Sequence, residues 1–384
     1  MMTPMFSLLV FSTLEKAGLI AIVGVFGLVV ILFLIVYLFF YVIRKQQKAK
    51  SNSQNTEFDN TSVISARELN SLLADKPLSL TKPRDEKIHL HNTVKLKNNM
   101  RYDILVGAKT DRGIRRRADV NQDNVLALTG ARFVNGSLEP FGVFIVADGM
   151  GGHQFGYEAS ARAIRVILDN LLQPLIDGQA LGNTQIAETL RSSIEAANID
   201  IYQRNKERNS DMGTTVTAAV VVPDIAFVAN VGDSRTYLLP VDRKLYQITE
   251  DHSVVAGLVL AGVIAPEDIY THPKRNQIYR SLGDSPDVDI DMFQVDIGVD
   301  DMLLLCSDGL WEMVRDWRLQ NIMENHSSVN KVIEELIEEA NDNGGVDNIS
   351  AICVKLAKAH EPILRAGVHL IVYPETLNVR KYEN

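Results

Sequence analysis

Residues 144–156, "FIVADGMGGHQFG", join an apolar run to an aspartate and then to a loop that is almost free of side chains. A short apolar run bounded by turn residues is typical of a buried strand. Asp148 stands at the end of this run, and glycines follow at positions 149, 151 and 152. Because glycine has no Cβ, such a backbone can approach a ligand closely. The stretch therefore predicts a carboxylate held over an open site at the edge of a sheet.

Four further aspartates have similar surroundings at the ends of apolar runs: Asp123 in "NQDN", Asp233 in "VGDSR", Asp308 in "CSDGL" and Asp347 in "GGVDN". One such residue has an ordinary explanation, since aspartate is common at turns. Five with the same local pattern favour a shared site. Oxygen ligands suit Mg²⁺ or Mn²⁺, and two such ions about 3.5–4 Å apart can hold a phosphoryl group and activate water.

Around this stretch, short apolar runs alternate with turns from position 102 onward, for example "YDILVGA", "NVLALTG" and "TTVTAAVVV". These runs predict strands. Apolar residues at helical spacing predict helices over 158–172, 184–203 and 329–341, and the last should stop before Gly344 and Gly345. Strands cluster and helices cluster, which indicates an α+β fold with mostly antiparallel sheets.

Net charge and the sequence around the cysteines argue against two classes of function, nucleic-acid binding and cysteine-phosphatase chemistry. The net charge of −9 argues against a nucleic-acid partner, because phosphate backbones require a basic surface. The two cysteines, Cys306 and Cys353, lie in apolar runs and predict buried thiols rather than a disulfide framework. A cysteine phosphatase needs an arginine six residues after its thiolate, and these positions hold Glu312 and Ala359.

Residues 17–43 contain no charged side chain. As a helix they would measure about 40 Å, which is longer than a hydrocarbon core of about 30 Å. A signal peptide and a buried helix are the alternatives, but a signal peptide carries its positive charges ahead of the apolar region. Here basic residues gather at 44–50, against Lys16 alone before the stretch. The pattern predicts one transmembrane helix with the N-terminus outside and the following domain cytoplasmic, at the inner or plasma membrane.

The chain is thus expected to contain five parts, in which the linker has the polar, proline-interrupted composition of a tether. They are a short extracytoplasmic N-terminus (1–16), the transmembrane helix (17–43), the polar linker (44–99), a catalytic domain (100–357) and a C-terminal tail without an assigned role (358–384).

Seven motifs occur in an order that identifies a family: "DGMGGH", "GTT", "VGDSRTYLL", "TEDHS", "RSLG", "CSDGLWEMV" and "GGVDNIS". Together they resemble the metal-dependent protein phosphatases, the type 2C serine/threonine class, in its bacterial branch. The resemblance covers roughly Arg101 to Leu356. It implies a four-layer α-β-β-α sandwich with two central antiparallel sheets. It also implies hydrolysis of phosphoserine or phosphothreonine by direct attack of a metal-bound water.

The resemblance assigns the metal ligands motif by motif. Asp148 corresponds to the ligand that bridges two Mn²⁺ or Mg²⁺ ions, and Gly149 offers its carbonyl. Asp308 and Asp347 complete the first metal site, and Asp233 corresponds to the ligand of a weaker third ion.

The loop "DRGIRRRADVNQDN" departs from the family pattern. Its last acid, Asp123, corresponds to a residue that either holds a metal through a water molecule or contacts the residues that bind the metal. The family places a phosphate-binding arginine ahead of this acid. Counting forward from Gly113 gives Arg116, whereas counting back from Asp123 gives Ala118, whose neighbour is Arg117. Arg117 is the first candidate and Arg116 the second.

Three other positions differ from relatives or stay open. Gln122 replaces a glutamate that other members use on the second metal. Met150 stands where animal relatives have a histidine proposed as general acid. His153 could take that role or bond within its own turn. The segment at about 253–285 corresponds to the family's flap beside the active site.

The sequence therefore predicts a membrane-anchored phosphoprotein phosphatase. The alternative is an inactive membrane-tethered module that binds phosphoproteins. The expected partners are phosphorylated proteins, a serine/threonine kinase or its substrates at the same membrane, and the lipid bilayer through 17–43.

Overall fold

The structure is a computed structural model that divides the chain into two units, residues 1–60 and 61–384. It describes residues 62–63, 102–134, 137–151, 154–176, 181–241, 244–359 and 367–372. The predicted transmembrane helix, the segment before it and nearly all of the linker lie outside these ranges. Within them, no helix is both long enough and apolar enough to cross a membrane.

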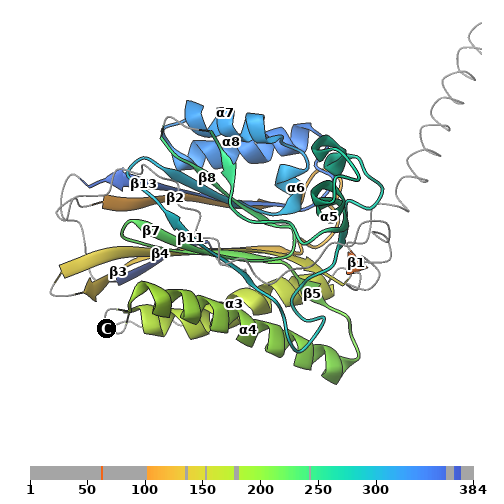
Figure 1. Ribbon diagram of the computed structural model, residues 1–384, viewed down its shortest axis with the longest axis horizontal. Coiled ribbons are helices and arrows are strands. Elements are labelled where there is room, and N and C mark those ends of the chain that lie inside the picture. Colours follow the sequence, from red (N-terminus) through yellow and green to blue (C-terminus); the bar gives the residue numbers. More distant parts are fainter. Residues whose placement is uncertain are drawn as a thin grey trace, which may run out of the picture. The chain divides into compact units, whose positions relative to one another are not determined.

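Two antiparallel sheets form the centre of the second unit (Figure 1). One has the order β11-β7-β6-β4-β3-β14, with the short β5 paired to β4. Its strands are β3 (Asp123–Val134), β4 (Ser137–Met150), β5 (Gly213–Thr214), β6 (Val216–Val222), β7 (Ile225–Val231), β11 (Asp291–Asp296) and β14 (Gly367–Val372).

The other sheet has the order β2-β13-β12-β8-β9. Its strands are β2 (Tyr102–Asp111), β8 (Arg235–Leu239), β9 (Tyr246–Gln247), β12 (Met302–Cys306) and β13 (Ile349–Lys358). Cys306 and Cys353 are buried in β12 and β13 as free thiols, as predicted. Burial raises the pKa of the Cys353 thiol to about 12, so neither sequence nor structure supports thiolate chemistry there.

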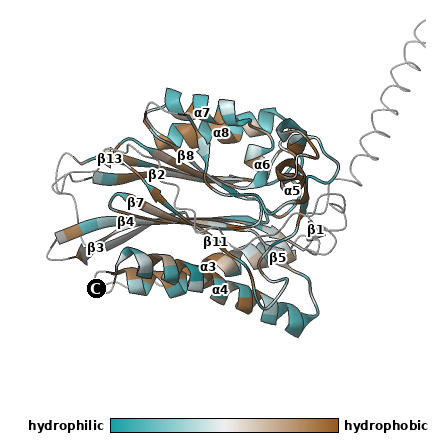
Figure 2. Ribbon diagram, viewed as in Figure 1, coloured by the Kyte–Doolittle hydropathy of each residue, from teal (hydrophilic) through white to brown (hydrophobic). Residues whose placement is uncertain are grey.

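Helices cover the outer face of each sheet (Figure 1). On the first sheet they are α3 (Gln154–Ile176) and α4 (Asn183–Arg208), and on the second α6 (Asp308–Trp311), α7 (Asp316–Asn325) and α8 (Val329–Asp342). Alternate strand residues face opposite ways. Phe144 therefore packs between the sheets while Ile145 packs under α3 and α4. Figure 2 shows that these helices turn polar residues outward. The predicted four layers are confirmed over the described residues.

The three predicted helices are present, each longer than its predicted range. The last one stops where expected, and Gly344 and Gly345 both adopt positive φ. The sequence did not predict α7, the short α6, or the two flap helices α5 (Val254–Leu260) and η1 (Pro266–Tyr270). β14 lies in the predicted tail and pairs with β3, so part of that tail completes the first sheet. In the flap, β10 (Gln277–Ile278) pairs with the linker residues Ser62–Val63, which form β1.

Candidate metal centre

Four of the predicted acids meet where strands of the two sheets end. Asp123 opens β3 and is the direct cross-strand partner of Asp148 near the end of β4. From the other sheet, Asp308 follows β12 and Asp347 precedes β13. Neighbouring strand ends place acids that are far apart in the sequence in one site. With Asp233, which follows β7, these residues form what we call the carboxylate cluster.

Hydrogen bonds tie the cluster to both sheets. The Ser307 hydroxyl donates to Asp123 Oδ2 at 2.7 Å and accepts from the Ser350 backbone N–H at 3.0 Å. On the β4 side, the Asp148 carbonyl accepts from the Thr214 hydroxyl and the Thr215 N–H, both at 2.8 Å. These bonds fix the backbone of both sheets at the positions from which the carboxylates project.

Burial and like charge make this cluster electrostatically unfavourable on its own. Asp148 is at the centre: desolvation raises its pKa well above the usual value, and the charges of Asp123, Asp308, Asp347 and Asp233 raise it further. The pKa of Asp123 rises to about 6, mainly by desolvation. Desolvation and the neighbouring acids also raise the pKa values of Asp233 and Asp308. Such shifts are typical of functional sites.

The donor set fits hard divalent cations. Asp123 Oδ1 and Asp308 Oδ1 are buried oxygens without a hydrogen-bond partner among the described residues. Buried acceptors without partners are costly, and a cation would satisfy them and cancel the repulsion. As the side chains stand, no three acids, histidines or cysteines of the described ranges converge closely enough to coordinate an ion.

The glycines beside the acids are explained by close packing. A Cβ at Gly149 would lie 2.0 Å from the carbonyl oxygen of Gly156, at the start of α3. A Cβ at Gly309 would lie 2.0 Å from the carbonyl oxygen of Asn348. The first contact brings the predicted Gly149 carbonyl ligand against the first turn of α3. At Gly149 and Gly309, close packing alone therefore requires glycine.

The structure distinguishes the two candidate arginines. Arg116 Nη1 lies 2.9 Å from Asp347 Oδ1, and each side chain is one-fifth exposed. The side chain of Arg117, the first candidate from the sequence, is exposed to solvent. Gly113 has a φ of 73°, and its carbonyl accepts a hydrogen bond from the Arg116 N–H. This turn directs the Arg116 side chain towards Asp347. The structure therefore brings the second candidate, Arg116, to the carboxylate cluster and leaves Arg117 in solvent, which favours counting forward from Gly113.

The structure also locates most of the other positions that the sequence left open, and one residue of the flap. The Gln122 side-chain oxygen lies against Gly156, where a Cβ would be only 2.1 Å away. Met150 is buried and pairs with Gly213 on β5. His153 lies outside the described residues. Arg275 of the flap forms an ion pair with Glu312 at 3.3 Å.

Glu312 was missed by sequence reasoning. It lies one helical turn after Asp308 and is 8% exposed, and desolvation together with the Asp308 charge raises its pKa to about 8. The signal was available, because residues four apart on a helix share a face.

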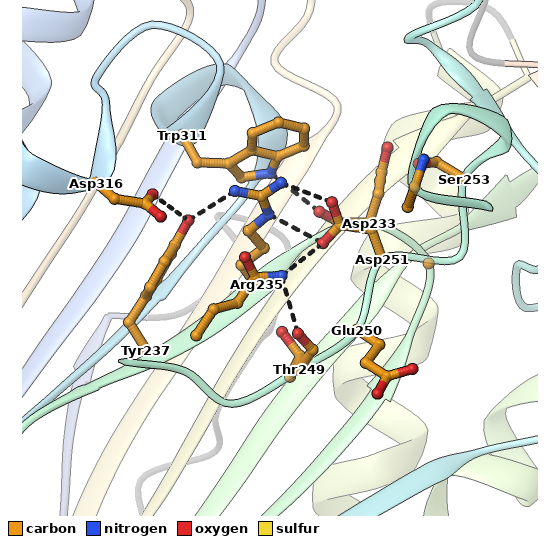
Figure 3. Close-up of polar contacts among 12 residues, drawn as sticks. Asp233, Arg235, Tyr237, Thr249, Glu250, Asp251, Ser253, Trp311 and Asp316 are labelled. Atoms are coloured by element: carbon orange, nitrogen blue, oxygen red, sulfur yellow. Dashed lines mark hydrogen bonds and ion pairs between the residues drawn. The ribbon is translucent and has the colours of Figure 1, made fainter. Parts of the chain in front are cut away.

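A second buried polar group borders the cluster (Figure 3). Arg235 donates to both carboxylate oxygens of Asp251, at 2.9 and 2.6 Å, and to the Tyr237 hydroxyl. Its guanidinium stacks on the Trp311 ring at 3.5 Å. The Trp311 indole N–H donates to the Asp233 carbonyl at 3.0 Å. This group, which we call the Arg235 network, fixes the backbone of one acid of the cluster.

Comparison with known proteins places the fold and the site in one family. Residues 112–352 match the family described as protein phosphatase 2C. The chain is 39% identical over 250 residues to the serine/threonine phosphatase stp of Listeria welshimeri, covering 64% of this chain and 94% of that one. It is 33% identical over 215 residues to the protein phosphatase PhpP of Streptococcus pneumoniae, covering 56% and 85%.

Solved structures agree. The serine/threonine phosphatase PstP/Ppp of Mycobacterium tuberculosis superposes with a TM-score of 0.56 at 31% identity, covering 66% of this chain and 99% of that one. A catalytic domain of PstP solved with two manganese ions superposes with the same TM-score at 29% identity, covering 67% and 100%. The chain belongs to the protein phosphatase 2C family, in the bacterial-type branch that contains these serine/threonine phosphatases.

Proposed function

We propose that this chain, a serine/threonine protein phosphatase by its family, hydrolyses phosphoserine and phosphothreonine in proteins with Mn²⁺ or Mg²⁺ as cofactor. The observation that carries the proposal is the carboxylate cluster: five acids with Asp148 at the centre, of which four have raised pKa values and the fifth, Asp347, lies beside Arg116. A cluster of this kind gains stability by binding cations, and cations in turn bind phosphate.

Each residue then has a defined task. Asp148, Asp308 and Asp347 would hold two ions, with the Gly149 carbonyl, and Asp233 a third. When bound, such ions supply Lewis acidity, which lowers the pKa of a coordinated water and neutralises phosphoryl oxygens. Asp123, fixed by Ser307, would accept hydrogen bonds within the site.

Arg116 would bind the substrate phosphate. Its guanidinium presents several N–H donors in one plane, a geometry that matches two phosphate oxygens. Arg116 lies beside Asp347, so a phosphate that it binds would be held next to the carboxylate cluster. No phosphoenzyme would be needed, because bound divalent ions would activate water as the nucleophile.

The second candidate is a module that binds phosphoproteins without turnover. Gln122 supports it, because an amide brings no negative charge where relatives use a glutamate. The cluster weighs against it, since a pure binding module would keep buried acids that repel one another without using them.

Phosphate release from a phosphothreonine peptide tests the proposal. We expect release with Mn²⁺, none with EDTA, and recovery when Mn²⁺ is added in excess. Binding of the phosphopeptide without release, by a protein that binds Mn²⁺, would instead establish the binding module.

We further propose that residues 17–43 anchor the phosphatase in a membrane with its catalytic domain in the cytoplasm, near a kinase or its substrates. The charge-free length and the basic residues at 44–50 support this. The full chain should stay in the membrane fraction after an alkaline carbonate wash, and a chain lacking residues 1–50 should not. Release of the full chain by carbonate would exclude a transmembrane anchor.

A further inference from the structure

A cavity of about 240 Å³ lies next to the cluster, between the end of α4 and two loops. The last turns of α4 line it with Tyr202 and Lys206. The segment 209–213 and the loop 281–284 form the other walls, and Met150 closes the side towards the metal centre. We call it the α4 pocket. Its volume is below the roughly 300–1,000 Å³ of small-molecule sites, so it suits one long side chain.

The α4 pocket is joined to the metal centre through backbone pairs. Gly149 and Met150 pair with Thr214 and Gly213, and Thr214 exchanges two backbone hydrogen bonds with Leu282. Met150 is two residues from Asp148, which corresponds to about 7 Å of extended chain. A peptide whose phosphorylated residue occupied the cluster would therefore bring a side chain two or three positions away over the α4 pocket.

The walls of the α4 pocket are rigid. The Asn205 side chain accepts from the Met212 N–H and donates to the carbonyls of Met212 and Gly283, at 2.7–3.0 Å. The Gly283 N–H in turn donates to the Asn198 side chain at 2.8 Å. One asparagine thus ties all three walls together, so the cavity does not depend on a bound ligand to keep its shape.

The α4 pocket also contains a polar group that lacks a partner. Ser281 is 4% exposed, and its hydroxyl makes no hydrogen bond to any described residue. A buried hydroxyl without a partner is unfavourable, and a polar ligand in the pocket would satisfy it.

The charges of the α4 pocket favour a cation. Asp211 and Asp284 are exposed acids on its walls, and the C-terminal carbonyls of α4 add negative potential. Lys206 is the cationic residue of the lining. Its ammonium lies 4.9 Å from the centre of the Tyr202 ring, and this cation–π contact already stabilises the lysine charge. Arg208, two residues after Lys206 at the end of α4, is paired with Glu158 at 2.7 Å.

We propose that the α4 pocket is a substrate subsite that takes a lysine or arginine side chain two or three residues from the phosphorylated residue. The inference rests on the proposed phosphatase function. Such a subsite would make the enzyme select basic phosphopeptides, and Asp211 and Asp284 would determine this selectivity.

The test compares phosphothreonine peptides that carry arginine, alanine or glutamate at the second and third positions on either side. The wild type should prefer arginine to glutamate, and Asp211→Asn and Asp284→Asn should each reduce this ratio of kcat/KM about threefold, as expected for an exposed ion pair. Asp284→Lys should reverse the preference. Added salt should weaken it, since the acids are exposed.

Asp287→Asn is the matched control, because Asp287 is an exposed acid on the same loop outside the pocket lining. It should leave the preference unchanged. Turnover of p-nitrophenyl phosphate, which has no flanking side chain, should be the same in every variant. That substrate also separates the two proposals. A wild-type protein that does not hydrolyse p-nitrophenyl phosphate would overturn the phosphatase function itself. An equal ratio in wild type and both pocket variants, or an equal loss in Asp287→Asn, would overturn the subsite.

Discussion

The carboxylate cluster and the Arg235 network are neighbours, and both consist of buried charged groups, but they differ in how the charges are balanced. In the network, Asp251 has a bidentate arginine partner, and that arginine also stacks on an indole ring. In the cluster, Asp148 faces four other acids and its pKa is raised well above the usual value. Buried charges that are balanced by partners support the fold, whereas buried charges of one sign are typical of a site that binds a ligand of the opposite charge.

The largest expected effect comes from removing a charge of the cluster. Asp308→Asn should lower kcat by at least about a thousandfold, because ligand loss removes several kcal/mol of transition-state stabilisation. The same change removes a buried repulsion, so the melting temperature of the metal-free protein should not fall. Steady-state kinetics with Mn²⁺ and a thermal melt in EDTA provide the two readouts. A folded variant with wild-type activity would refute the assignment of Asp308.

Breaking the Arg235 network should have the opposite signature. Asp251→Ala leaves Arg235 buried without its partner and should cost about 3–5 kcal/mol in the free energy of unfolding. Urea denaturation measures this loss. A double variant, Arg235→Met with Asp251→Leu, should recover part of it, since it leaves no unpaired charge. A single variant as stable as the wild type would mean that the network does not support the fold.

The pH dependence of stability should show the cluster directly. The pKa of Asp123 is about 6 in the folded protein, above its usual value of 3.8. Between about pH 4 and pH 6 the folded state therefore binds more protons than the unfolded state. The free energy of unfolding of the metal-free protein should fall as pH rises through this window, by about 3 kcal/mol from this group.

Denaturation in EDTA across this range measures the slope. Asp123→Asn should flatten it, whereas the exposed control Asp287→Asn should not. A wild-type stability that rises over the same window would show that Asp123 is compensated in the folded state.

The smallest effect distinguishes the two arginines. Arg116→Ala should raise KM about tenfold, as expected when one charged hydrogen-bonding group is lost from a bound phosphate. Arg117→Ala should change KM less than twofold, because its side chain is exposed. Initial rates with a phosphothreonine peptide decide between them, and equal effects of the two changes would place the phosphate elsewhere.

Sequence patterns predicted the antiparallel strands with aspartates at their ends, and the family resemblance implied the four layers; the described residues show both, because an apolar run that ends in aspartate depends only on local strand position. They left the choice of arginine open, since the loop after Gly113 differs in length from the family pattern and only its turn geometry favours Arg116. They also missed Glu312, although its position four residues after Asp308 was a readable signal, and the pair of Arg235 with Asp251, which forms only when the chain folds.

Binding of Mn²⁺ tests the assignment of the carboxylate cluster most directly, because we expect divalent cations to balance its charge. We would measure the melting temperature of the full chain in detergent at pH 7.5, with EDTA and with Mn²⁺, for wild type and Asp308→Asn. The account predicts a clear rise with Mn²⁺ in the wild type and a much smaller one in the variant. A wild-type melting temperature that does not change with Mn²⁺ would contradict it.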